Sequence, residues 1–133
     1  LEPKIPEDIK KLSIEFSGIL RSKGIILFDN WFNNGPNSLK NDLPKSWQKN
    51  IVKIYSGKSL ILHTVSREDL LKTKLFALCD RGIDEKDCIF LKPTRDELIN
   101  AMIWVNERDG NSLWPKHVKN TFERLANKLG YEL

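Results

Sequence analysis

The sequence predicts an α+β protein in which a short β-hairpin or small sheet is flanked by about five helices. Two observations predict it. Apolar side chains recur at intervals of three and four residues in several separate stretches, which is the spacing of amphipathic helices. In addition, two short apolar runs, Ile51–Tyr55 and Leu60–Val65, flank a Ser-Gly-Lys-Ser turn at residues 56–59, and this arrangement is typical of a β-hairpin.

The first predicted element is a helix from Pro6 to Lys23. Proline suits the first turn of a helix, and Gly24 suits the left-handed position just after a helix end. The apolar run Ile25–Phe28 predicts a short buried strand, and residues 29–50 are expected to form an irregular segment that two tryptophans pin to the core. The apolar stripe of the helix consists of Ile9, Leu12, Phe16, Ile19 and Leu20.

Four more helices are predicted after the hairpin. Ser66 and Thr94 are each followed three residues later by an acidic residue, as in a capping box, so each is expected to begin a helix. The helices cover residues 66 to about 80, 85 to about 91, 94 to about 108, and 115 to 130. We expect residues 1–133 to form a single domain, with residues 94–133 as a C-terminal helical hairpin.

Composition narrows the class of protein. The net charge of +4 allows acidic partners without demanding them. No apolar run approaches the roughly 18 residues of a membrane span, and no signal peptide opens the chain, so a cytoplasmic protein without a membrane partner is expected. Cys79 and Cys88 are predicted to be free thiols, because a two-cysteine metal site needs closer spacing and further ligands.

Several catalytic motifs are missing. The residues Gly57-Lys58-Ser59 are only a fragment of a phosphate loop, which needs a further glycine at the place held by Val52. The two histidines, His63 and His117, lack the spacing of a zinc-protease motif, and no serine lies in a Gly-x-Ser-x-Gly elbow. The residues therefore assign neither a catalytic group nor a metal ligand.

Lys74 is the most unusual polar residue of the predicted helices. Helical spacing places it on or near the buried edge formed by Leu71, Leu75 and Leu78. Its side chain either extends along the apolar surface toward water or points its ammonium into a cleft that receives a phosphate. Asp87, at the head of the next helix, either holds this lysine or caps its own helix.

Two stretches, which together span about residues 25–92, resemble a known family. The first combines Trp31-Phe32-Asn33-Asn34 with Leu43-Pro44-Lys45-Ser46-Trp47. The second is the hairpin followed by residues 68–77, then Arg81 and Lys86-Asp87. In this order they are similar to uncharacterised bacterial nucleotidyltransferase-like proteins, which are related to the nucleotidyltransferase toxins of toxin–antitoxin and abortive-infection systems.

The resemblance implies the C-terminal part of a nucleotidyltransferase-like fold. It implies transfer of a nucleoside monophosphate from a nucleoside triphosphate to an RNA or protein acceptor, with two Mg²⁺ ions on carboxylates. The acceptor in related toxins is tRNA, so tRNA or another RNA and a cognate toxin or antitoxin are the expected partners. By the same likeness Lys74 contacts the triphosphate, Asp87 orients it, and Arg81 is a weaker candidate for a phosphate contact.

The sequence departs from the family in its metal site. The Gly-Ser pair and the Asp-x-Asp motif are both absent, and Leu1 falls just past the place expected for the second carboxylate. We therefore expect either a truncated piece or a protein that lost this part, and in both cases a chain that is inactive or nearly so. Asp29 lies in the region of a third carboxylate, although aspartate is equally suited to a turn there.

Two other functions stay open. A degenerate nucleotidyltransferase fold would act as a non-catalytic nucleotide- or RNA-binding module or as an antitoxin-like interaction domain. The second open function is that of a small interaction domain whose resemblance to the family arises by chance. Five lysines either contact phosphates or form a solvated face: Lys45, Lys49, Lys53, Lys58 and Lys72.

Overall fold

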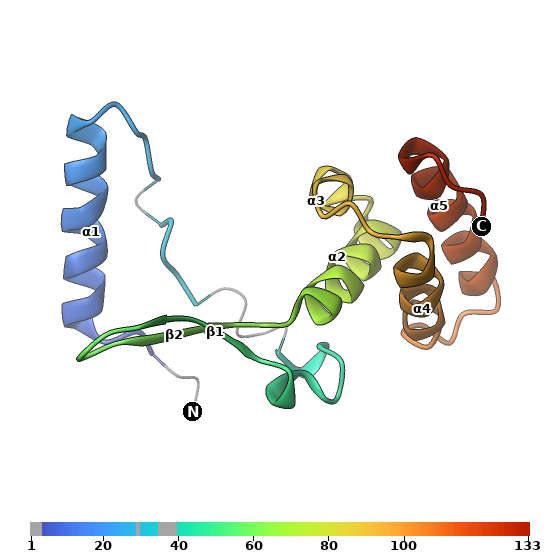
Figure 1. Ribbon diagram of the computed structural model, residues 1–133, viewed down its shortest axis with the longest axis horizontal. Helices are drawn as coiled ribbons and strands as arrows, with labels where there is room; N and C mark the ends of the chain where they lie inside the picture. The colour runs from blue at the N-terminus through green and yellow to red at the C-terminus, as the bar shows by residue number, and fades with distance from the viewer. Residues whose placement is uncertain (1–3, 29, 35–39) are drawn as a thin grey trace. The chain divides into compact units, whose positions relative to one another are not determined.

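The computed structural model describes residues 4–28, 30–34 and 40–133. It divides into two compact units, Leu1–Asp42 and Leu43–Leu133, and each is described by itself. The described residues form five α-helices, a 3₁₀ turn and a two-stranded antiparallel sheet (Figure 1). This confirms the predicted α+β class, while the expectation of a single domain stays a prediction. None of the helices in the described ranges is both long and apolar enough to cross a membrane.

The first unit contains one helix, α1 (Glu7–Ser22). Gly24 follows it in the left-handed conformation, with φ of 80°, and the next backbone N–H reaches back to the Leu20 carbonyl at 3.0 Å. Such a bond satisfies a carbonyl that the helix end leaves without a partner. Trp31 packs on the helix, because its indole Nε1 donates to the Ser13 carbonyl at 3.1 Å and its ring lies 5.7 Å from that of Phe16.

The predicted strand Ile25–Phe28 is wrong. In the described residues the only paired strands are those of the hairpin, and this run has no strand partner. Its side chains are not buried as expected, since Ile26 is 76% and Phe28 79% exposed. An apolar run becomes a buried strand only where another strand pairs its backbone and a layer covers its side chains.

The hairpin consists of β1 (Val52–Ser56) and β2 (Ile61–Thr64), which pair antiparallel as predicted. The register pairs Lys53 with His63 and Tyr55 with Leu62, so that Ile54 is an extra residue in a bulge. The turn closes through a 2.8 Å bond from the Gly57 N–H to the Leu60 carbonyl. All residues of both strands are exposed in this unit.

The core of the second unit is helical. Its helices are α2 (Arg67–Arg81), α3 (Glu85–Phe90), α4 (Arg95–Asn106) and α5 (Trp114–Leu129), close to the four predicted ranges. They pack against one another (Figure 1) because α2, α4 and α5 contribute apolar side chains at helical spacing to a single buried cluster, to which α3 adds Cys88. Fully buried members include Leu71, Leu75, Leu98, Val105, Val118, Phe122 and Leu125. Burying a side chain of this size contributes roughly 1.5–3 kcal/mol.

Caps and loops fix where these helices begin and end. The predicted capping box is present, with the Thr94 hydroxyl accepting from the Glu97 N–H and the Glu97 carboxylate accepting from the Thr94 N–H. Between α4 and α5, the Trp114 indole donates to the Val105 carbonyl at 2.9 Å. Both cysteines are buried free thiols, as predicted.

Candidate functional site

Lys74 and Asp87 meet in the structure. The Lys74 ammonium donates to the Asp87 carboxylate at 2.7 Å and lies 3.4 Å from the carboxylate of Asp84. The Lys74 side chain is 29% exposed, so its stem follows the edge of the core while its charge reaches the surface. The sequence left two roles open for Asp87, holding this lysine or capping its own helix, and in the structure Asp87 holds the lysine.

The turn between α2 and α3 places both carboxylates beside the lysine. Gly82 ends α2 in the left-handed conformation, with φ of 69°, and Asp84 adopts φ of 68° just before α3. Aspartate tolerates this region better than most residues with a Cβ, for which it costs roughly 1–2 kcal/mol. Asp84 and Asp87 are three residues apart, and such spacing puts two side chains on one face of a helical turn.

The two carboxylates of this cluster favour the charged form of Lys74. The hydrogen bond that Lys74 donates to Asp87 raises the pKa of Lys74, burial opposes that rise, and the charge of Asp84 adds to it. The ammonium therefore stays protonated throughout the neutral range. Its two contacts use at most two of its three N–H donors. Directly after Asp87, Cys88 is fully buried, and burial raises the pKa of its thiol to about 12.

Arg81, the third residue implied by the resemblance, is placed differently. It is the last residue of α2 and half exposed, and its guanidinium lies 3.9 Å from the carboxylate of its neighbour Asp80. In the described part of the chain the Lys74 cluster forms without it.

Asp84 is the residue that the sequence argument missed. Its contact with Lys74 depends on a left-handed backbone conformation, which helical spacing does not predict. The signal that would have found it is the pair of aspartates three residues apart after a helix-ending glycine, opposite a lysine on the preceding helix.

A buried carboxylate at the start of α2 fixes a second segment. Asp69 is 1% exposed and accepts from the Ser66 hydroxyl at 2.8 Å and from the Asn50 side-chain amide at 3.3 Å. Its own backbone N–H donates to the Ser66 hydroxyl at 3.1 Å. Because Asn50 directly follows the short 3₁₀ helix η2 (Trp47–Lys49), this carboxylate joins that segment to α2.

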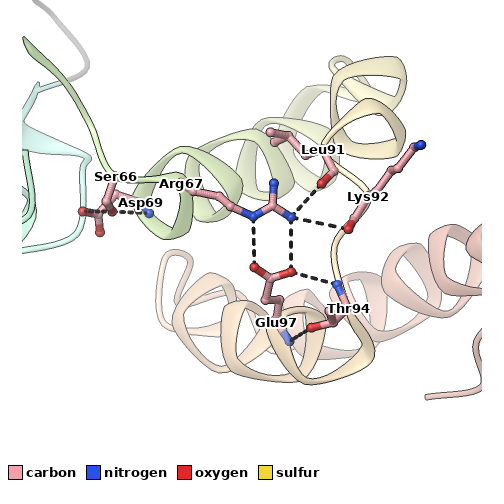
Figure 2. A network of polar contacts seen from close by, with 7 residues as sticks. All are labelled: Ser66, Arg67, Asp69, Leu91, Lys92, Thr94 and Glu97. Carbon is pink, nitrogen blue, oxygen red and sulfur yellow. Dashed lines mark hydrogen bonds and ion pairs between the residues drawn. The ribbon is translucent and has the colours of Figure 1, made fainter. Parts of the chain in front are cut away.

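Arg67 links α2 to the loop before α4, as Figure 2 shows. Its guanidinium donates to both carboxylate oxygens of Glu97, at 3.2 and 3.3 Å, and to the backbone carbonyl of Leu91 at 2.7 Å. Glu97 also accepts from the Thr94 N–H at 2.8 Å. Since Leu91 directly follows α3, the network holds the end of α3 against α2, which carries Lys74.

The residues described do not fit a two-metal centre. No group of three or more histidine, cysteine, aspartate or glutamate side chains comes together in the described ranges in a way that would hold a metal ion. Asp29, the candidate third carboxylate, lies outside the described residues. We therefore derive no metal-dependent step on this chain.

The five candidate phosphate-binding lysines fall into two groups. Lys72 pairs with Glu68 at 2.5 Å and its side chain is only 17% exposed. It lines a shallow cavity of about 160 Å³ between α2 and α4, which is smaller than a usual ligand pocket of at least roughly 300 Å³. Lys45, Lys49, Lys53 and Lys58 are all exposed.

Comparison of the chain with family models, with curated proteins and with solved structures finds no match in any of the three.

Proposed function

We propose that this chain is the nucleotide-binding part of a nucleotidyltransferase-like protein, which moves a nucleoside monophosphate from a nucleoside triphosphate to an RNA or protein acceptor. The observation that supports the proposal is the Lys74 ammonium, held at the edge of the core by Asp84 and Asp87. The sequence resemblance supports the proposal as well, because the Trp31 and Trp47 motifs, the hairpin and this helix follow one another in the order of the family.

Each residue of the cluster has a distinct role in this proposal. Lys74 donates to a phosphate oxygen through an N–H that its two carboxylate contacts leave over. Asp87 orients the ammonium, and Asp84 fixes it from the second side. Two carboxylates beside one ammonium give the cluster a net negative charge, which disfavours a bare triphosphate. We therefore expect the nucleotide to bind as its Mg²⁺ complex, which carries less negative charge.

Binding without transfer is the second function that the cluster supports. A non-catalytic nucleotide-binding module or an antitoxin-like domain would need Lys74 but no metal-holding carboxylates. The two are separated by offering a radiolabelled nucleoside triphosphate and tRNA. Labelling of the tRNA requires transfer, whereas saturable retention of nucleotide without labelling indicates binding alone.

The proposal is tested by calorimetric titration of the chain with ATP, GTP, CTP and UTP, with and without Mg²⁺. Lys74→Ala removes a charged donor, so we expect it to weaken binding by roughly tenfold or more. Lys74→Arg should keep part of the affinity. Lys116→Ala is the matched control, because it removes the same charge from an exposed position on α5 outside the Lys74 cluster, and we expect less than a roughly threefold change.

Circular dichroism of each variant checks that the helices are intact. If Lys74→Ala binds every nucleotide as well as the unaltered chain does, the role given to Lys74 is wrong. If the unaltered chain binds no nucleotide under any condition, the proposed function fails as a whole.

A further inference from the structure

The net charge of the chain is concentrated in one stretch. Residues 1–42 carry six basic and six acidic side chains, and residues 67–133 carry twelve of each. Residues 43–66 carry four lysines and no acidic residue, so the whole net charge of +4 arises there. We call residues 43–66 the basic segment. It comprises η2, the hairpin and the connections on either side of them.

The lysines of the basic segment differ in their surroundings from the cations that form ion pairs in the helices of their unit. In the helices, Arg67, Lys72, Lys74 and Lys128 each contact a carboxylate at 3.3 Å or less. By contrast, among the described residues none of the four lysines of the basic segment forms an ion pair, and all four are exposed. Their charges are therefore available to a partner.

The hairpin register arranges the segment into two unlike faces. One face carries Lys53 beside its cross-strand partner His63, together with the pair Ser56 and Ile61. Lys58 lies in the turn that joins the two strands. The opposite face carries the pairs Val52 with Thr64 and Tyr55 with Leu62. Side chains directly opposite each other on a sheet lie about 4.5–5.5 Å apart, so the lysine and the imidazole ring are neighbours.

We propose that the basic segment docks a single strand of nucleic acid through its phosphodiester backbone. Its charge favours a polyanion, and its lysines are not gathered into a pocket: Lys53 and Lys58 belong to the hairpin, while Lys45 and Lys49 lie beside and within η2. From Lys53 to the turn the strand covers roughly 13–17 Å, which is the length of several nucleotides. The exposed His63 ring on the same face offers a surface on which a base stacks.

A nucleic-acid strand fits this surface better than a lipid bilayer does. A membrane-binding element buries a continuous apolar surface among the lipids, whereas the face that carries Lys53 and His63 combines these two polar side chains with the mixed pair Ser56 and Ile61. The basic segment would hold the RNA acceptor of the proposed transfer reaction, and this acceptor role rests on the proposed function. Strand binding itself is measured independently of nucleotide binding.

The test is fluorescence anisotropy of a labelled 20-nucleotide oligouridine with the full 133-residue chain, over a range of potassium chloride concentrations. In the test variant Lys45, Lys49, Lys53 and Lys58 are all replaced by glutamine. The control variant has the same net charge but carries four substitutions elsewhere: Lys11→Gln, Lys86→Gln, Lys116→Gln and Lys119→Gln. Circular dichroism and gel filtration verify that both variants are folded and monodisperse.

Each phosphate contact contributes about −0.7 to the slope of log affinity against log salt for a single strand. Losing up to four contacts should therefore make the slope shallower by roughly 2–3 and weaken binding by at least tenfold at low salt. The control should stay within about threefold of the unaltered chain. Lys53→Gln with Lys58→Gln, which leaves η2 unchanged, should give about half of the slope change.

Three outcomes would overturn the proposal: equal losses in the test and control variants, an unchanged test variant, or binding of anionic phospholipid vesicles without binding of oligouridine. Titration of the test variant with ATP separates this inference from the proposed function. Retained ATP affinity together with lost strand binding supports two distinct sites. Unchanged strand binding together with a Lys74-dependent ATP site refutes only the docking surface.

Discussion

Replacing Arg67 with methionine is expected to weaken the connection between α2 and the loop that precedes α4. The ion pair with Glu97 and the hydrogen bonds to the Leu91 and Lys92 carbonyls are lost. The two-pronged ion pair with Glu97 joins side chains that are 49% and 33% exposed, so solvent screening limits it to roughly 0.5–1 kcal/mol. The bond to the Leu91 carbonyl, at 2.7 Å, contributes about another 1 kcal/mol. We therefore expect a loss of roughly 1.5–2 kcal/mol and a fall in Tm of roughly 6–12 °C.

A double-mutant cycle isolates the ion pair from the rest. Arg67→Met, Glu97→Gln and the double variant are unfolded in urea and followed by circular dichroism, and we expect a coupling of roughly 0.5–1 kcal/mol. Glutamine at position 97 still accepts from the Thr94 N–H and so keeps the capping box. The pair of Lys119 and Glu123 on α5, at 3.7 Å and more exposed, is the control, with a coupling below about 0.5 kcal/mol.

The same pair predicts a pH dependence. The hydrogen bond from Arg67 lowers the pKa of Glu97 below its ordinary value of 4.5, with a second contribution from the Thr94 backbone. Because the folded pKa lies below the unfolded one, this stabilisation is fully present above pH 4.5 and is lost as the pH falls through the folded pKa. In Arg67→Met the acid loss should be smaller. Zero coupling together with an unchanged acid profile would refute the proposed linkage.

Two further predictions concern the helical core. Phe122→Ala, at a fully buried position, should lower the free energy of unfolding in urea by roughly 3–5 kcal/mol. The control Leu113→Ala, at a side chain that is 70% exposed, should lower it by less than about 0.5 kcal/mol, and similar losses at both sites would contradict the assigned core. Burial raises the pKa of Cys79 and Cys88 to about 12. At neutral pH we therefore expect both thiols to react with an aromatic disulfide reagent only when the helical unit unfolds locally. Reaction of either thiol at the rate measured for the urea-unfolded chain would show that the thiol is accessible in the folded protein.

The helices of the second unit were predictable because their signals are local. Apolar spacing identified the buried faces, and the Thr94 and Glu97 box located the start of α4 to within one residue. The hairpin followed from two apolar runs around a turn, although its bulge at Ile54 did not. A bulge depends on how two strands align, and the sequence of one strand does not contain that information.

The errors and omissions concern contacts between distant residues. Ile25–Phe28 has the composition of a strand, but composition does not supply a pairing partner. Asp84 reaches the Lys74 cluster through a left-handed backbone conformation, and the spacing of the two aspartates indicates the shared face but not that conformation. Lys74 and Asp87 were identified from helical spacing, which left the direction of the lysine open, and only the resemblance to a family implied a contact with a triphosphate.

The hairpin has a consequence for handling the protein. A sheet of two strands has two outer edges, and the unpaired N–H and C=O groups of such edges can pair with those of another molecule. Charged lysines along an edge oppose this association because like charges repel. Lys53 and Lys58 would then keep the molecules apart in concentrated solution. At protein concentrations far above those of a strand-binding titration, neutralising these lysines or raising the salt concentration should increase the fraction of dimers and larger assemblies in light scattering.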